Sequence, residues 1–328
     1  MGALLLIACA IIIIVVLIVG LYQKSTNAIC KSKKRLDGKT VIVTGGTSGM
    51  GLRTAVDLAD RGARVIIACP FSNEGEEALK IIKKETESDN VVFELLDLSS
   101  IESVRKFVAI INKREERLDI LVNNAGVGAV PEFITDDGMS FIMQVNYFGT
   151  VLLTLLLLPL LKKSGTSSEP ARIVSISSVL HNIGTINFGK LNDIKHYYPY
   201  QIYGNSKLCL VLFSNALVKK LKSSNVVVNC VDPGIVGTGI FYCPGTVFRY
   251  ILNILFCILS KTPWEGAQTA LHVALDKRAG NVTGGFFKNC KQIRARRLAY
   301  NEKIAKKLWE QSMRLLKLSD EEVEQCLK

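Results

Sequence analysis

The sequence is poor in histidine, with only three among 328 residues, at positions 181, 196 and 272. Three residues so far apart lack the ligand spacing of a structural metal site, so we expect no metal. Cysteines number nine, which is odd, and no two of them form a Cys-x-x-Cys pair. Cys69 and Cys230 stand in apolar stretches. This usage indicates buried, reduced thiols and excludes a disulfide framework.

Acidic residues are also scarce, with 29 Asp and Glu against 41 Lys and Arg, a net charge of +12. Such a balance is compatible with nucleic-acid binding, yet the sequence has no zinc-finger spacing and no aromatic platform among its basic residues. The basic residues gather in two places, just after the apolar N-terminus and in the tail from Arg294 onward. We therefore expect an anionic membrane surface as the partner, and no nucleic acid.

Charge is missing altogether from Gly2 to Leu21. A helix of that length spans about 30 Å, which is the thickness of the hydrocarbon core of a bilayer. No basic side chain precedes this apolar run, as one would in a cleaved signal peptide, so we interpret residues 1–22 as a retained transmembrane signal anchor. The basic linker 23–36 follows it, and the positive-inside rule then places the folded part in the cytosol.

After Leu36, short apolar segments alternate with longer amphipathic ones. The short segments are rich in Val and Ile without strict alternation, which indicates strands buried on both faces of a parallel sheet. We predict an α/β fold, a single Rossmann-type doubly wound parallel sheet with helices on both faces, over residues 37–290. A basic helical extension, 291–328, follows it. Expected strands are 40–44, 64–68, 91–95, 120–122, 172–176 and 226–231, and expected helices are 49–61, 74–87, 101–116, 139–163 and 200–223.

A glycine-rich turn, Thr44-Gly-Gly-Thr-Ser-Gly-Met-Gly51, joins the first expected strand to the first expected helix. Gly45 permits the tight turn, Gly49 lets the main chain approach a pyrophosphate, and Gly51 allows the helix to pack against the strand. The phosphates would bind at the positive helix N-terminus. Together with these glycines, the turn contributes three further candidate cofactor-binding residues, Thr47, Ser48 and Met50.

The end of the second strand normally selects between the two nicotinamide dinucleotides, and here it reads Ala68-Cys69-Pro70. It has neither an acid for the ribose diol nor a base for a 2′-phosphate. The lack of a repelling carboxylate slightly favours NADP(H) over NAD(H), while the reach of the neighbouring Arg53 and Arg64 stays open.

Asp97 and Leu98 follow the third expected strand, where a side chain can contact the adenine. The alternative for Asp97 is a helix cap, with Ser99 and Ser100 as rival caps.

Tyr203 and Lys207 are separated by four residues at the start of an expected helix, so their side chains share one face. A free tyrosine, with a pKa near ~10, exchanges protons poorly at neutral pH. A cation held close should lower that pKa and make the phenol useful in general acid–base catalysis.

Three other motifs accompany this pair: Asn123-Asn-Ala-Gly126 ends the fourth strand, Ser177-Ser178 ends the fifth, and Asn146 stands in the helix between them. With the glycine turn, the set resembles the short-chain dehydrogenase/reductase family over roughly residues 37–285. The resemblance implies a single-domain Rossmann-type enzyme.

The resemblance also assigns roles. Tyr203 exchanges a proton with the substrate oxygen, Lys207 binds the nicotinamide ribose, Ser178 rather than Ser177 orients the carbonyl, and Asn146 holds a water relay. Plainer alternatives remain, in which Asn146 only bridges backbone groups and Ser178 caps a turn. The implied cofactor-binding residues include Tyr203 and Lys207 themselves, with Asn124, Ala125, Gly126, Pro233, Gly234, Val236 and Thr238.

Within the family, the anchor, the segment 172–181 and the segment 261–267 are most similar to the membrane-bound retinol dehydrogenase group, with polyprenol-oxidising relatives nearby. Pro70 departs from that group, which usually has Arg there. The resemblance implies hydride transfer between a nicotinamide and an apolar, lipid-like alcohol or aldehyde such as retinol or retinal, at the endoplasmic reticulum or lipid droplets. Polyprenol or steroid oxidation, and a non-catalytic membrane-tethered dinucleotide-binding scaffold, remain alternatives.

Two apolar runs remain. Residues 241–260 lie where the family places a substrate lid, and such a lid on the bilayer would admit a lipid. A core helix or a dimer contact is the alternative. Val151–Leu161 indicates core or a subunit interface, so a homodimer stays open.

Overall fold

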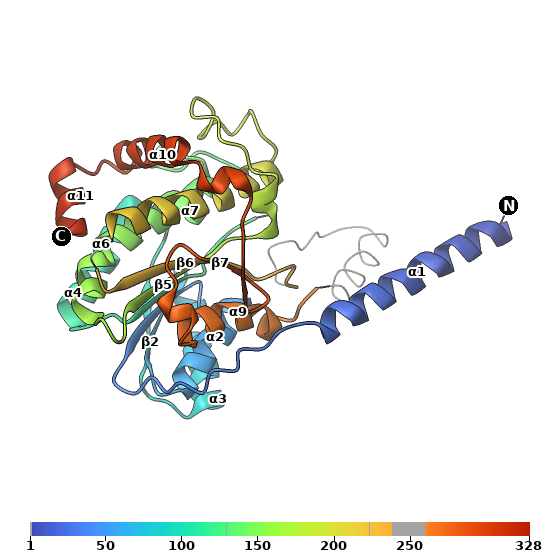
Figure 1. The fold of residues 1–328 in the computed structure, drawn as a ribbon, viewed down its shortest axis with the longest axis horizontal. Helices are drawn as coiled ribbons and strands as arrows, with labels where there is room; N and C mark the ends of the chain where they lie inside the picture. The colour runs from blue at the N-terminus through green and yellow to red at the C-terminus, as the bar shows by residue number, and fades with distance from the viewer. Residues whose placement is uncertain (1, 129, 223, 238–259) are drawn as a thin grey trace.

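The structure is a computed structural model that describes residues 2–128, 130–222, 224–237 and 260–328. Two sequence predictions, Thr238 and the lid over 241–260, therefore lie outside the described residues, except for Ser260. The described chain forms one eight-stranded sheet with helices on both faces, from which a single N-terminal helix projects (Figure 1).

The sheet has the order β3-β2-β1-β4-β5-β6-β7-β8. Strands β1 to β7 pair in parallel, and β8 pairs antiparallel with β7. The chain order reverses between β1 and β4, which is where open parallel sheets form a crevice at the carboxyl ends of their strands. All six predicted strands are confirmed, and two short ones are added. Their bounds are β1 Thr40–Thr44, β2 Arg64–Cys69, β3 Val91–Leu95, β4 Ile120–Asn123, β5 Ala171–Ile176, β6 Val226–Asp232, β7 Phe286–Lys288 and β8 Lys291–Ile293.

Helices cover the sheet in two layers, each with its own apolar core. One core joins α4, α6 and α7 to the sheet, and the other joins α2, α3 and α9. Helix α9 was not predicted. The main helices are α2 Gly49–Asp60, α3 Ser72–Thr86, α4 Ile101–Arg114, α6 Gly149–Ser164, α7 Pro199–Lys220 and α9 Pro263–Leu275.

The helix predicted over 139–163 is interrupted. Helix α5, Phe141–Met143, runs into a π-helical segment, Gln144–Phe148, and only then into α6. By length and composition the stretch Phe141–Ser164 would cross a membrane, but 89% of its most apolar window is buried within the domain. The leucine-rich run is therefore core.

The C-terminal extension completes that core. Helix α10, Glu302–Leu315, packs on α7, and α11, Asp320–Leu327, packs on α6. Trp309 stacks on Phe213 with ring centroids 5.5 Å apart, and the Tyr147 hydroxyl is 2.8 Å from the Ser312 hydroxyl. The final helix of the chain thus covers apolar surface of α6.

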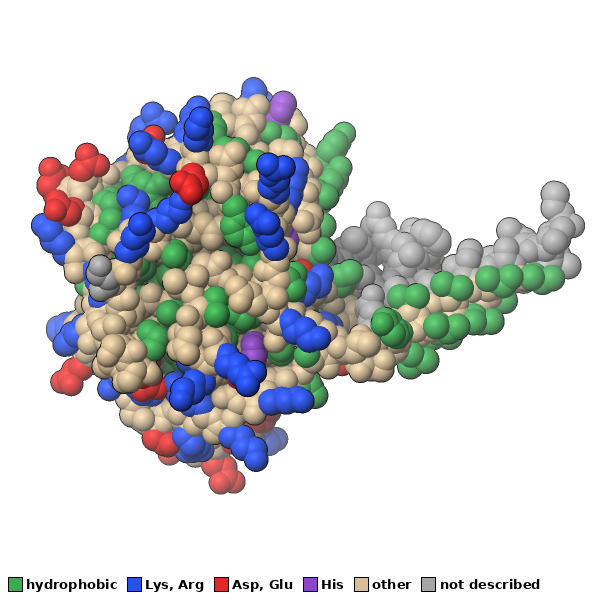
Figure 2. Space-filling view, in the orientation of Figure 1, with side chains coloured by type: hydrophobic (Ala, Val, Ile, Leu, Met, Phe, Trp, Pro, Cys, Tyr) green, Lys and Arg blue, Asp and Glu red, His purple; other side chains and the backbone are tan. Residues whose placement is uncertain are grey.

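Helix α1, Gly2–Ser25, stands clear of the domain (Figure 1), and its described apolar side chains between Ile7 and Tyr22 are exposed (Figure 2). The segment after it is fixed rather than free. Asn27 donates to Glu265 at 3.1 Å, and the Cys30 backbone N–H donates to Gln268 at 3.1 Å. Thr26 and Asn27 also share a cavity with Gly234, which follows β6. The exit of α1 therefore lies beside the carboxyl edge of the sheet.

Cysteine usage agrees with the sequence analysis. Cys69, Cys209, Cys230 and Cys326 are buried, and every described cysteine whose side chain is placed is a free thiol.

Candidate active site

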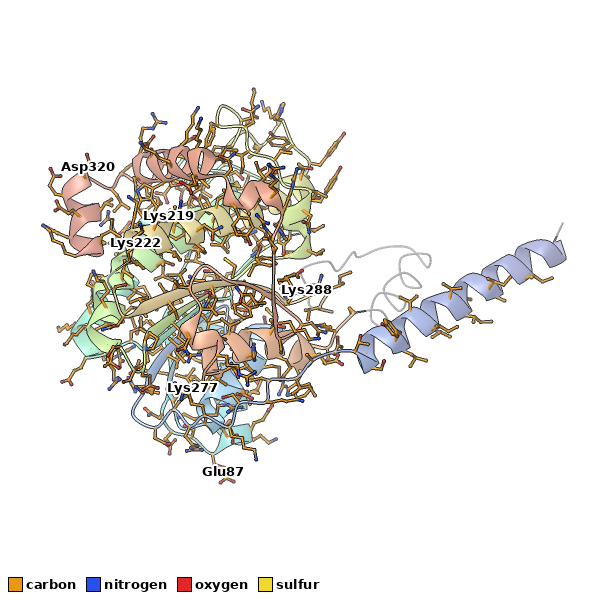
Figure 3. All side chains as sticks on the ribbon, in the orientation of Figure 1. Glu87, Lys219, Lys222, Lys277, Lys288 and Asp320 are labelled. Atoms are coloured by element: carbon orange, nitrogen blue, oxygen red, sulfur yellow. The ribbon has the colours of Figure 1, made fainter. Side chains whose placement is uncertain are left out.

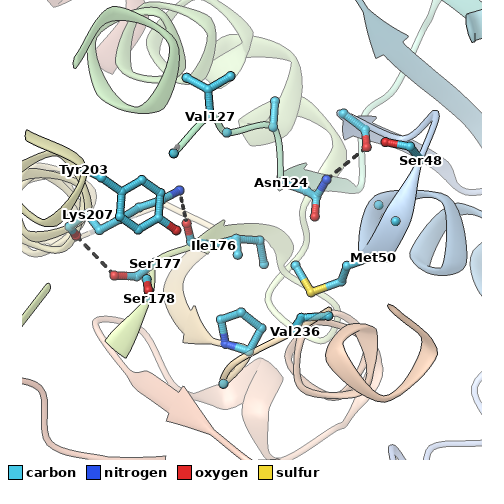
Figure 4. Close-up of a pocket in the computed structure, with 18 of the residues that line it drawn as sticks. Ser48, Met50, Asn124, Val127, Ile176, Ser177, Ser178, Tyr203, Lys207 and Val236 are labelled. Carbon is cyan, nitrogen blue, oxygen red and sulfur yellow. Dashed lines mark hydrogen bonds between the residues drawn. The ribbon is translucent and has the colours of Figure 1, made fainter. Parts of the chain in front are cut away.

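A cavity of about 530 Å³ lies at the carboxyl ends of the central strands (Figure 4). It brings together the glycine turn after β1, the loop after β4, the serines after β5, the first turns of α7 and the loop after β6. Its wall is formed by Gly45, Ser48, Gly49, Met50, Gly51, Asn124, Ala125, Gly126, Val127, Gly128, Val130, Ile176, Ser177, Ser178, Tyr203, Lys207, Pro233, Gly234 and Val236.

The glycine turn is built so that side chains cannot enter it. Gly45 has a positive φ of 61°, and a Cβ on Gly51 would lie only 2.0 Å from the Gly45 carbonyl oxygen. Ser48, the N-cap residue of α2, makes no side-chain bond to the helix. The first-turn N–H groups of α2 therefore remain available for an anion in the cavity. Thr47 does not line the wall.

Asn124 ties the loop after β4 to that turn. Its amide nitrogen donates to the carbonyl oxygens of Thr44 and Gly45 at 2.9 and 3.1 Å. The Ala125 backbone N–H donates to the Thr44 hydroxyl at 3.0 Å. The cavity is lined by Asn124, Ala125 and Gly126. The first two also join the loop after β4 to the glycine turn after β1.

Asp97 and Leu98 are not on the cavity wall. The Asp97 carboxylate accepts from the backbone N–H and the hydroxyl of Ser99, at 2.8 and 2.6 Å. Leu98 is buried beneath Gly149. The cap of α4 is Ser100, whose hydroxyl accepts from the Ser103 N–H at 3.2 Å.

Both cations considered for a 2′-phosphate have carboxylate partners. Arg64 makes two bonds to Glu115, at 2.7 and 2.8 Å, at the start of β2 and therefore at the opposite edge of the sheet. Arg53 pairs with Glu85 of α3 at 2.6 Å. Pro70 is exposed.

Tyr203 and Lys207 extend from one face of α7 into the cavity, as the spacing predicts (Figure 4). The two serines after β5 differ in their partners. Ser177 donates to the Lys207 carbonyl oxygen at 3.1 Å, whereas Ser178 hydrogen-bonds with the Tyr203 side chain. The Ser178 hydroxyl also accepts from the Leu180 N–H at 3.2 Å, so it caps a turn as well. This geometry favours Ser178 as the partner of Tyr203.

The pKa of Tyr203 moves opposite to the expected direction. Burial raises it to about 12, and the hydrogen bond with Ser178 only opposes that rise. Lys207 does not lower it, because its ammonium donates to the Ile176 carbonyl oxygen at 3.0 Å and stands 5.5 Å from the tyrosine ring centroid. Burial also lowers the pKa of Lys207 to about 8. At pH 7 the pair is thus a neutral phenol beside an ammonium.

Asn146 lies behind the wall, in the π-helical segment. Its side chain accepts from the Val127 N–H and donates to the Val127 carbonyl oxygen, both at 2.8 Å, and donates to Ser206 at 3.1 Å. A Cβ on Gly126 would lie 3.2 Å from both Asn146 Oδ1 and Lys207 Nζ. Asn146 therefore fixes the loop against which the lysine rests, which is the backbone-bridging alternative.

Sequence reasoning did not single out Val127, Gly128, Val130 and Ile176 as part of this wall. Three of them, Val127, Gly128 and Val130, lie within four residues after the Asn-Asn-Ala-Gly motif, and that position is the signal that would have identified them. Within the described residues no group of three or more His, Cys, Asp or Glu is placed to hold a metal.

Comparison with known proteins agrees with this geometry. A family model described as short chain dehydrogenase matches residues 39–242. Retinol dehydrogenase 13 of Homo sapiens is 40% identical over 298 residues, covering 89% of each chain. Retinol dehydrogenase 12 of Bos taurus is 40% identical over 293 residues, covering 88% of this chain and 90% of the relative.

Solved structures share the architecture. An uncharacterised protein from Mycobacterium paratuberculosis superposes with a TM-score of 0.68 at 29% identity, covering 87% of this chain and 96% of its own. The Pseudomonas aeruginosa RhlG/NADP active-site complex gives 0.60 at 26% identity, covering 77% and 95%. The chain therefore belongs to the short-chain dehydrogenase/reductase family and is an oxidoreductase homologous to the retinol dehydrogenases.

Proposed function

We propose that the protein transfers hydride between a nicotinamide dinucleotide and an apolar alcohol or aldehyde, with retinol and retinal as the first candidates. The observation that carries this proposal is the position of the Tyr203 phenol. It hydrogen-bonds with Ser178 and lies one helical turn from Lys207, in the same cavity as the glycine turn. An acid and an oxygen-orienting hydroxyl are thus held beside a phosphate-binding turn.

The glycine turn fits a dinucleotide, because a Cβ at Gly51 would collide with the backbone and the first residues of α2 line the cavity without a side-chain cap. The residues proposed to hold it are Gly45, Ser48, Gly49, Met50, Gly51 and the wall after β4 and β6. When bound, the dinucleotide would supply or accept the hydride.

The protein's own contribution is proton transfer and orientation. In carbonyl reduction, the neutral phenol of Tyr203 would donate its proton to the substrate oxygen, while the Ser178 hydroxyl holds that oxygen in place. Lys207 is the cation among the residues of the cavity wall, 5.5 Å from the tyrosine ring centroid, and would be the positive charge nearest to the phenolate left behind. Alcohol oxidation uses the same groups in reverse, with phenolate as the base.

NADP(H), rather than NAD(H), is the proposed cofactor. It is supported by the absence of a carboxylate in the described stretch Cys69-Pro70-Phe71 after β2. A carboxylate there would bind the ribose diol and repel a 2′-phosphate. Of the nearby cations, Arg53 is the one on the same side of the sheet as the glycine turn, and it would have to leave Glu85 to bind a phosphate.

The substrate proposal is supported by the apolar side chains on the cavity wall, namely Val127, Val130, Ile176 and Val236, and by the names of the relatives. Polyprenols and steroids share this chemistry and are the next candidates.

Helix α1 is the proposed membrane anchor. Its described side chains are apolar and exposed, Leu21 for example by 67%, and Lys24 follows at its end. An exposed apolar helix needs lipid or a partner to cover it. The basic residues after it support a cytosolic side for the domain by the positive-inside rule, and the endoplasmic reticulum or lipid droplets are the proposed membrane.

The test is to purify the full chain in detergent and follow the absorbance of NADPH or NADH with retinal, a polyprenal and a ketosteroid. We expect retinal reduction, faster with NADPH. The variant Tyr203→Phe should lower turnover by about 10²- to 10⁴-fold. The matched control is Tyr200→Phe, an exposed tyrosine on the same helix, which should retain activity. Absence of turnover with all three carbonyls at saturating dinucleotide would refute the proposal.

A further inference from the structure

A second cavity lies at the opposite edge of the sheet from the active site. We call it the basal cavity, and its volume is about 510 Å³. Glu169 and Pro170 in its wall precede β5, and Leu275 and Lys277 end α9 or follow it. The whole wall consists of Ser32, Lys34, Ser168, Glu169, Pro170, Arg172, Leu275, Lys277, Gly280 and Asn281, all of them described residues.

Arg172 is the unusual member of this wall, since it is a cation with only 5% exposure. Its Nη1 atom donates to the carbonyl oxygens of Val273 and Asp276, at 3.0 and 2.8 Å, near the end of α9. No carboxylate of the described chain lies within ion-pair distance of it. A buried guanidinium without a paired anion is costly, and such groups normally have one.

Part of the guanidinium remains free to bind. Nε and Nη2 of Arg172 donate to no atom of the described chain. In the described chain the fully enclosed polar atoms without a partner are Asn123 Oδ1 and Glu132 Oε2. Neither Arg172 nitrogen is among them, so each keeps some accessible surface, and the residue lines the cavity. Gly280 makes room for them, because a Cβ there would lie 2.2 Å from Nη2. Two adjacent N–H donors in one plane can each donate to a different oxygen of the same oxyanion.

The surrounding charges favour a doubly charged anion. On the wall, Lys34, Arg172 and Lys277 contribute three positive charges against one negative charge from Glu169, an excess of two. Two charges outside the wall cancel each other, since the Asp276 carboxylate acts on Arg172 and Lys39 pairs with Glu169. Glu169 is already held by Lys34 and Lys39, at 2.5 and 2.7 Å, and these contacts lower its pKa to about 2. Its repulsion of an incoming anion is therefore largely compensated.

The position of the cavity indicates a soluble ligand rather than a lipid headgroup. In Figure 3, Lys277 lies on a part of the domain remote from α1, whereas Lys288 lies near the end of that helix. We propose that the basal cavity binds a phosphate group of a soluble molecule, with the Arg172 fork as its principal contact and Lys34 and Lys277 at the rim. A phosphate carries about −1.5 to −2 charges near neutral pH, which matches the excess.

The experiment titrates the full chain in detergent with inorganic phosphate, against chloride at equal ionic strength, and measures heat of binding and Tm. Saturating reduced dinucleotide is present throughout, so that the glycine turn cannot account for the signal. We expect saturable phosphate binding that raises Tm. Lys277→Gln should weaken it by about 1.5- to fivefold. Lys222→Gln, an exposed lysine elsewhere, should leave it unchanged.

Arg172→Lys should abolish saturable binding, because an ammonium cannot form the fork. If that variant does not fold, the double change Lys34→Gln and Lys277→Gln decides, and it should lower the affinity further than either change alone. Phosphate binding that is absent, or that survives the double change undiminished, would overturn the proposal. A lipid headgroup would be the ligand instead if the chain binds no free phosphate but binds phosphatidylserine vesicles, and Lys277→Gln weakens that vesicle binding. That result would also overturn the proposal. None of these readouts depends on hydride transfer.

Discussion

Replacing Lys207 by methionine should abolish activity and yet leave the dinucleotide-free protein as stable as before, or more stable, at pH 7. The side chain is 3% exposed, and burial lowers its pKa to about 8 from an ordinary 10.5. The difference of about 2.5 units corresponds to about 3 kcal/mol. Because the unfolded chain binds this proton more tightly, the cost is fully present below pH 8 and disappears as the pH rises to 10.5.

One contact opposes this gain. Lys207 donates to the Ile176 carbonyl oxygen at 3.0 Å, and methionine would leave that buried acceptor without its donor, at a cost of about 1–3 kcal/mol. The net change at pH 7 is therefore between about 0 and 2 kcal/mol in favour of the variant. Above pH 10.5 only the lost hydrogen bond remains, so the variant should become the less stable protein.

Urea unfolding of the full chain in detergent, without dinucleotide and at pH 7, 8, 9 and 10, measures this difference. Lys222→Met is the control, since an exposed lysine has no buried charge to relieve. A variant less stable than the parent by more than about 1 kcal/mol at pH 7 would refute the reasoning. So would a stability difference that does not change with pH.

Two further predictions concern packing. Gly51→Ala should destabilise the chain by about 1–3 kcal/mol and weaken dinucleotide binding, because its Cβ would lie 2.0 Å from the Gly45 carbonyl oxygen. The control is Gly189→Ala, whose Cβ would lie at an ordinary van der Waals distance from its neighbours. It should leave both the thermal stability and the dinucleotide binding unchanged. Trp309→Ala should cost about 3–5 kcal/mol in urea unfolding, since the ring is 8% exposed and stacks on Phe213. Wild-type stability in that variant would mean that α10 is not part of the core.

Much of the fold was predictable because its signals are local. Strands β1, β2, β4, β5 and β6 are almost entirely buried, and the glycine turn marks the junction of β1 and α2. Strands β7 and β8 were missed because each has three residues, too few for any periodicity. Helix α9 was missed although Thr262 and Glu265 form a capping box at its start, which is a signal readable from sequence.

In the candidate site, too, the features with a local sequence signal were predicted and those that depend on distant residues were not. Tyr203, Lys207 and Ser178 were placed together by motif spacing, and the structure has them in one cavity. The direction of the Tyr203 pKa shift was wrong, because it depends on burial by distant segments, which spacing does not reveal. The partners of Arg53 and Arg64 were also unreadable, since Glu85 and Glu115 lie 32 and 51 residues away.

The last helix of the chain has a consequence for biosynthesis. Cys326 is a buried residue of the larger core, and Lys162 of α6 donates to the carbonyl oxygens of the final two residues, each at 2.5 Å. Leu327 lies 165 residues after Lys162 in the sequence, so during synthesis the α6 surface stays uncovered until α11 has emerged from the ribosome. Exposed apolar surface of this kind is where nascent chains aggregate. A product that lacks α11 would never bury this surface, so loss of that helix should yield an insoluble protein rather than a slightly weakened enzyme.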